Sequence, residues 1–137
     1  MCLNLKCRVK NKKREDIIFL IAGNGSLSDN VKSFINQENL NKNIILLGLL
    51  NKKEMINFYN SIDIYVSTSL SDGGLSSSIA EAMSFERVVV VTNNSDNSFW
   101  IKDLENGYLF DNKDYQKLQE LIENISAERD KNEEIAK

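Results

Sequence analysis

The sequence predicts an α/β fold with a doubly wound, Rossmann-like parallel sheet. Two observations lead to this prediction: short apolar runs recur along the chain, and segments with helical periodicity lie between them. Strands that alternate with amphipathic helices favour right-handed βαβ crossovers, which place helices on both faces of an open sheet. A chain of 137 residues fits one such domain with a single hydrophobic core.

Five apolar runs are interpreted as strands. The first is a continuous apolar run, which is typical of a strand buried on both faces, and similar runs follow, the last of them weaker. The first run ends in Gly23-Asn24-Gly25, which we interpret as a turn because the third glycine of a dinucleotide fingerprint is absent. The five predicted strands span residues 17–22, 44–49, 64–68, 88–92 and 108–110.

Three segments between the strands have apolar residues at i, i+3, i+4 and i+7, which predicts amphipathic helices. We expect Ser26 or Ser28 to cap the first helix, Asn51 to cap the second, and a further helix to begin near Ser76. The apolar positions are Leu27, Val31, Phe34 and Ile35, then Met55, Phe58, Tyr59 and Ile62, then Tyr115, Leu118, Leu121, Ile122 and Ile125.

Composition excludes several classes of protein. The hydrophobic share of 42% and charged share of 27% are typical of globular chains, and no apolar run is long enough to span a bilayer. The N-terminus has no secretory signal, so we expect a cytoplasmic protein. With no histidine and two cysteines, His-based triads and the usual zinc patterns are excluded. We expect no metal site and no cofactor.

Charge divides the chain into three parts. Residues 1–16 are predicted to form a basic helix or arm, residues 17–125 the folded domain, and residues 126–137 a charged C-terminal helix or tail. A basic arm could contact nucleic acid or anionic lipid, but a solvated helix face is favoured because no aromatic residues are interleaved to stack on bases. We therefore expect no nucleic-acid partner.

The loop that follows Thr68 is the strongest candidate site. Ligands of open parallel sheets bind beyond the carboxyl ends of the strands, and here Gly73 and Gly74 precede a helix whose free N–H groups suit a diphosphate. Glu81 follows about one and a half turns into this helix, where a carboxylate can accept two hydrogen bonds from ribose hydroxyls. The alternative is that Asp72 and the serines cap the helix and Glu81 is a surface residue; composition alone leaves both interpretations open.

Residues 71–83 resemble the signature of the retaining, family-four GT-B glycosyltransferases, the glycosyl transferases group 1. In that signature two acidic residues are separated by seven others, and the second is followed by Ala-Met. Glu81-Ala82-Met83 matches the second half. Asp72 lies nine positions before Glu81 instead of eight, as if one glycine had been inserted.

The resemblance extends over residues 17–125 and implies a nucleotide-sugar-binding domain, the C-terminal half of a GT-B fold. It implies that Asp72 and Glu81 form the catalytic pair, with Asp72 on the sugar and Glu81 on the ribose. The phosphates and the sugar would be bound by the backbone of Gly73, Gly74, Leu75, Ser76 and Ser77. The nucleobase would contact Leu49, Leu50 and Asn51. Leu49 and Leu50 otherwise have the character of core residues.

Three departures from the family pattern qualify this expectation. Glu86-Arg87-Val88 stands where relatives have Gly-x-Pro, and Phe99 stands where relatives often have Glu. The first strand of the domain, with the Arg and Lys that clasp the diphosphate in relatives, is expected to lie outside this chain, as is the acceptor-binding N-terminal domain. The isolated chain is therefore expected to be inactive.

The function that the resemblance implies is transfer of a hexose-like sugar from a nucleotide diphosphate to a glycan or lipid-linked acceptor, in cell-surface polysaccharide synthesis. The expected partners are the donor and, through the N-terminal domain, the acceptor, with peripheral membrane contact of the full-length enzyme. The alternative is a non-catalytic nucleotide- or partner-binding module, or the inactive remnant of a transferase.

Overall fold

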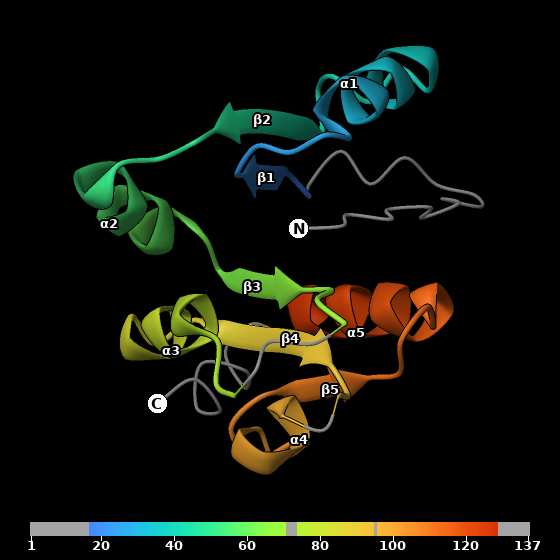
Figure 1. The fold of residues 1–137 in the computed structure, drawn as a ribbon. Helices are drawn as coiled ribbons and strands as arrows, with labels where there is room; N and C mark the ends of the chain where they lie inside the picture. Colours follow the sequence, from blue (N-terminus) through green and yellow to red (C-terminus); the bar gives the residue numbers. More distant parts are fainter. Residues whose placement is uncertain (1–16, 71–73, 95, 129–137) are drawn as a thin grey trace. The chain divides into compact units, whose positions relative to one another are not determined.

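The computed structural model describes residues 17–70, 74–94 and 96–128. Strands and helices alternate along them, as the sequence predicts (Figure 1). Two compact units are formed, one up to Met55 and the other from Ile56 onward. The basic arm 1–16, Asp72, Gly73 and the last part of the charged tail lie outside the described residues.

The unit up to Met55 contains two parallel strands, β1 (Phe19–Ala22) and β2 (Ile44–Gly48), with helix α1 (Ser28–Gln37) between them in sequence. The register pairs Phe19 with Ile44 and shifts by one residue at the end of β1. Burial alternates along β2, and its outward-facing Ile45 and Leu47 are 43% and 37% exposed. The predicted strands are present, but the expectation that β2 is buried on both faces is wrong, because one apolar face of β2 lies in solvent.

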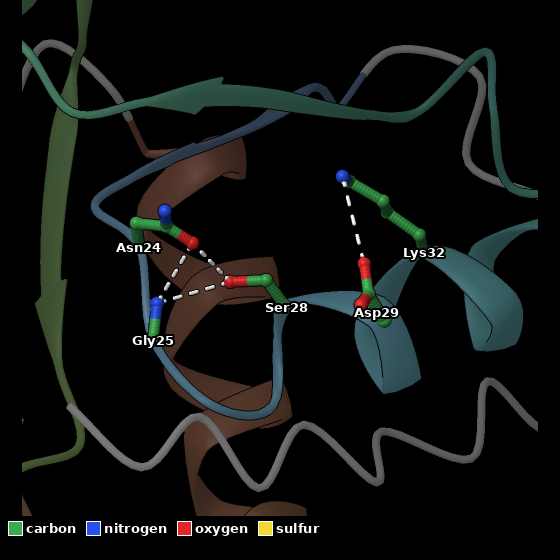
Figure 2. A network of polar contacts seen from close by, with 5 residues as sticks. All are labelled: Asn24, Gly25, Ser28, Asp29 and Lys32. Carbon is green, nitrogen blue, oxygen red and sulfur yellow. Dashed lines mark hydrogen bonds and ion pairs between the residues drawn. The ribbon is translucent and has the colours of Figure 1, made fainter.

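A network of side-chain and backbone hydrogen bonds stabilises the turn after β1 (Figure 2). The Asn24 amide oxygen accepts from the Gly25 N–H at 2.9 Å and from the Ser28 hydroxyl at 2.6 Å. Since the Ser28 side chain is engaged in this turn, it does not cap α1, and the N-cap position is Leu27 with no side-chain cap. The prediction of Ser26 or Ser28 as the cap is therefore wrong. Residues 23–25 lie in the loop between β1 and α1, and the hydrogen-bonded turn comes directly after them, closed by the Ser28 N–H donating to the Gly25 carbonyl at 3.0 Å.

Helix α2 (Lys52–Ser61) begins directly after Asn51, the residue predicted to cap it. The Asn51 side chain accepts from the Glu54 N–H at 3.0 Å, and the Glu54 carboxylate accepts from the Asn51 N–H at 2.8 Å. This reciprocal pair is a capping box, which satisfies two N–H groups that an uncapped helix would leave unpaired.

The unit from Ile56 onward contains a parallel sheet in the order β3-β4-β5. The strands are β3 (Ile64–Ser67), β4 (Val88–Thr92) and β5 (Tyr108–Phe110), and every residue of the central strand β4 is buried. Helix α3 (Ser77–Ser84) packs on β3 and β4, and helix α5 (Tyr115–Ala127) packs on β5 (Figure 1). The apolar positions predicted within α5 from Leu118 onward are buried: Leu118, Leu121, Ile122 and Ile125.

Two features of this unit were not predicted. A short helix, α4 (Asn97–Trp100), follows β4. Helix α3 ends in a Schellman motif: the Glu86 N–H donates to the Met83 carbonyl at 2.9 Å, and the Arg87 N–H donates to the Ala82 carbonyl at 3.0 Å. Glu86 takes the left-handed conformation that this motif requires, with φ of 57°. Here a glutamate occupies the position where glycine is usual.

Candidate functional site

The loop between β3 and α3 leads into a helix N-terminus that has no side-chain cap. Gly74 has φ of 117°, a conformation that a side chain would strain, and no atom lies within 4 Å of where its Cβ would be. Leu75 and Ser76 follow, and Ser76 is the N-cap, in extended conformation and with no side-chain hydrogen bond that caps a helix N–H. The predicted start of the helix near Ser76 is confirmed. Asp72 and Gly73, predicted for this loop, lie outside the described residues.

The first turn of α3 offers backbone N–H donors. Its first intrahelical bond runs from the Ala80 N–H to the Ser76 carbonyl at 3.0 Å, so the N–H groups of Ser77, Ser78 and Ile79 precede it. The hydroxyls of Ser76 and Ser78 lie 2.9 Å apart. Unpaired N–H groups and the positive end of the helix dipole together favour an anion such as a phosphate.

Glu81 lies one turn further along α3, on its exposed side. Its carboxylate Oε2 accepts a hydrogen bond of 2.9 Å from the hydroxyl of Tyr59, on α2. The Tyr59 ring is only 1% exposed. Burial, with the hydrogen bond to Glu81 and its negative charge, raises the pKa of the Tyr59 hydroxyl, which therefore keeps its proton and donates. Sequence reasoning identified Glu81 as a site residue, but it identified Tyr59 only as a residue of an apolar helix face.

Polar residues at the end of β4 and shortly after it hold the start of the β3–α3 loop. The Thr92 hydroxyl donates to the Ser69 carbonyl, and the Asn94 amide donates to the same oxygen at 3.4 Å. The buried Asn97 amide in turn donates to the Thr92 carbonyl at 3.1 Å. The carboxyl ends of neighbouring parallel strands are thus tied together where ligands of such sheets bind. Sequence reasoning missed these residues; their place at or shortly after the carboxyl end of a predicted strand was the available signal.

The three residues predicted to meet a nucleobase follow β2, in the unit up to Met55. Leu49 is 78% exposed, so its interpretation as a core residue is wrong, and Leu50 is half-buried. The side chain of Asn51 is engaged in the cap of α2. Leu49 therefore presents an apolar side chain to solvent at the carboxyl end of a parallel strand.

Among the described residues, no group of three or more Cys, Asp or Glu side chains is arranged to hold a metal ion. Their helices include none with the length and apolar character needed to cross a bilayer.

A parallel α/β unit whose strand leads through a Gly- and Ser-rich loop into an open helix N-terminus has the architecture of a nucleotide-binding domain. The chain belongs to the glycosyl transferases group 1 family, whose family model matches residues 5–137. No curated protein matches the chain.

Solved structures share the fold, which is that of the Rossmann-like C-terminal domains of GT-B glycosyltransferases. A variant of S. aureus TarM, in complex with fondaparinux, alpha-GlcNAc-glycerol and UDP, is 28% identical with a TM-score of 0.80, over 87% of this chain and 24% of TarM. Anabaena HepE in complex with UDP is 21% identical with a TM-score of 0.77, over 88% and 34%. The C-terminal domain of LpcC from Francisella tularensis is 26% identical with a TM-score of 0.72, over 81% and 57%. This chain spans about a quarter of the length of TarM.

Proposed function

We propose that this chain is the donor-binding part of a retaining glycosyltransferase of family four, which transfers a hexose-like sugar from a nucleotide diphosphate to a glycan or lipid-linked acceptor. The observation that carries the proposal is the Glu81 carboxylate, oriented by Tyr59, one turn behind the open start of α3. The complex of TarM with UDP supports a nucleotide donor. We place the activity in the cytoplasm, in cell-surface polysaccharide synthesis.

The proposed donor lies along α3 with its ribose near Glu81 and its phosphates at the helix start. A single carboxylate has enough acceptor positions for two vicinal ribose hydroxyls, and the N–H groups at the start of α3 are suited to the diphosphate. Asp72 and the backbone from Gly73 to Ser77 are assigned to the transferred sugar and the phosphates. Leu49, Leu50 and Asn51 are assigned to the nucleobase.

We further propose that the isolated chain binds the donor without appreciable transfer. The helix N-terminus supplies only about half an elementary charge to a diphosphate leaving group. Preorganised positive charge is usually the largest catalytic contribution, and the proposed site places no Arg or Lys of the described residues on the diphosphate. Robust sugar transfer by the isolated chain would contradict this proposal.

The test is a calorimetric titration of the 137-residue chain with UDP, GDP, ADP and the corresponding diphosphate sugars. At least one nucleotide should bind, and Glu81→Gln should weaken it about tenfold or more, because hydrogen bonds to a charged group contribute about 1.5–3 kcal/mol. Glu120→Gln, the same chemical change at an exposed position of α5, is the matched control and should leave binding unchanged.

Two outcomes contradict the proposal. Absence of binding by every nucleotide and nucleotide sugar removes the donor site altogether. Equal affinities of the Glu81→Gln and Glu120→Gln variants would show that the Glu81 carboxylate does not bind the ribose.

A further inference from the structure

The contact between Tyr59 and Glu81 joins the core of the fold to its candidate site. The Tyr59 ring is stacked on Phe85, with centroids 5.3 Å apart and planes at 23°, and meets the edge of Phe58 at 5.5 Å. These contacts hold a ring that is almost entirely buried. Its hydroxyl is therefore fixed by packing, and that hydroxyl lies 2.9 Å from Glu81 Oε2 and 3.3 Å from the Ser78 carbonyl.

Glu81 has the opposite character, because it is an exposed side chain on a helix. A free glutamate in such a position occupies several rotamers, all but one of which must be given up when a ligand is bound in a defined geometry. The hydroxyl proton has two acceptors in reach, and the shorter bond, to the charged carboxylate, is the stronger one. That bond uses one acceptor position of Oε2 and leaves Oε1 and a second position of Oε2 open.

We propose that Tyr59 is a positioning residue that holds the Glu81 carboxylate in the orientation in which it accepts the two ribose hydroxyls of the donor nucleotide. The inference rests on the proposed function and adds to it the origin of ribose selectivity. Tyr59 itself does not contact the nucleotide; it acts through the carboxylate. Selectivity for a ribonucleotide then depends on a side chain in the hydrophobic core.

The experiment compares UDP with 2′,3′-dideoxy-UDP, which lacks both hydroxyls that Glu81 would bind. Each is titrated calorimetrically into the wild-type chain, Tyr59→Phe, Glu81→Gln and the double variant. Tyr115→Phe, which removes a tyrosine hydroxyl on α5, is the matched control. Circular dichroism and thermal unfolding establish that each variant is folded.

The expected wild-type chain prefers UDP to the dideoxy analogue about tenfold or more. Tyr59→Phe should lose most of that preference by weakening UDP binding while binding the analogue as the wild type does. The double variant should be no weaker toward UDP than Glu81→Gln alone, because Tyr59 acts only through Glu81. Tyr115→Phe should retain the full preference.

A purely structural role for Tyr59 would weaken both ligands by the same factor, and this result overturns the inference. It is also overturned, with the proposed function intact, if Glu81→Gln abolishes the preference and Tyr59→Phe retains it. A wild-type chain that binds UDP and its dideoxy analogue equally, or that binds neither of them and neither GDP nor ADP, overturns the proposed function and this inference with it.

Discussion

Glu86 offers a direct test of how the end of α3 is stabilised. It occupies the first position after the helix cap, with φ of 57°, in a motif closed by bonds of 2.9 and 3.0 Å from its own N–H and that of Arg87. Left-handed backbone brings Cβ of any residue but glycine too close to the neighbouring carbonyl oxygen. We predict that Glu86→Gly stabilises the chain.

The magnitude follows from two opposing contributions. Relief of the left-handed conformation is worth roughly 1–2 kcal/mol. The greater freedom of glycine in the unfolded chain costs roughly 0.5–1 kcal/mol. The net gain is about 0.5–1 kcal/mol, which corresponds to a rise in Tm of about 2–8 °C for a small unit of this kind.

Thermal unfolding followed by circular dichroism measures the effect, with two controls at the same position. Glu86→Ala removes the charge but keeps Cβ, so its Tm should remain near the wild-type value. Glu86→Asn should be intermediate, because asparagine tolerates left-handed backbone better than other residues with a side chain. A rise for Glu86→Ala as large as that for Glu86→Gly would refute the backbone explanation and assign the effect to charge.

Three further substitutions have defined expectations. Gly107→Ala places a methyl group 2.7 Å from Cγ2 of the buried Val89 and should destabilise the chain by about 1–3 kcal/mol in thermal unfolding, whereas Gly25→Ala, with no atom within 4 Å, should show no such loss. Above about pH 10 the wild type should lose more stability than Tyr59→Phe. Burial raises the pKa of Tyr59 above its unfolded value of about 10, so the contribution of the protonated hydroxyl to stability is fully present below that pH and is lost as the pH rises toward the raised pKa. Equal losses in the two proteins would contradict this linkage. Asp114→Ala removes the acceptor of a 3.0 Å bond from a first-turn N–H of α5 and should cost about 1 kcal/mol in urea unfolding; an unchanged midpoint would show that the cap contributes nothing.

Most of the strands could be predicted because their signal is continuous and local. The predicted bounds of β4 and β5 agree with the structure, and those of the other strands extend one or two residues too far. The apolar run of 17–22 begins before the first hydrogen-bonded pair at Phe19, because burial and ladder pairing need not start at the same residue. Helix α4 has only four residues, too few to show helical periodicity.

The candidate site could be predicted in its local part only. The glycines, the serines and Glu81 are close together in sequence, and an open helix start after a parallel strand has a known chemistry. Tyr59 is 22 residues before Glu81, and its apolar spacing correctly predicted a buried ring. The spacing of apolar residues predicts that a tyrosine ring is buried, but it does not predict which group the hydroxyl contacts. The same holds for Thr92, whose apolar strand gave no indication that its side chain bonds to the loop after β3.

The outward face of β2 has a consequence for handling this protein at high concentration. Residues 44–50 carry no charge and no proline, β2 pairs with β1 alone among the described strands, and Ile45 and Leu47 face solvent. Short, uncharged segments of high strand propensity at a sheet edge are templates for intermolecular pairing. The colloidal stability of this chain is therefore expected to be limited by β2, and Leu47→Lys should lower its light scattering at high concentration without changing the fold.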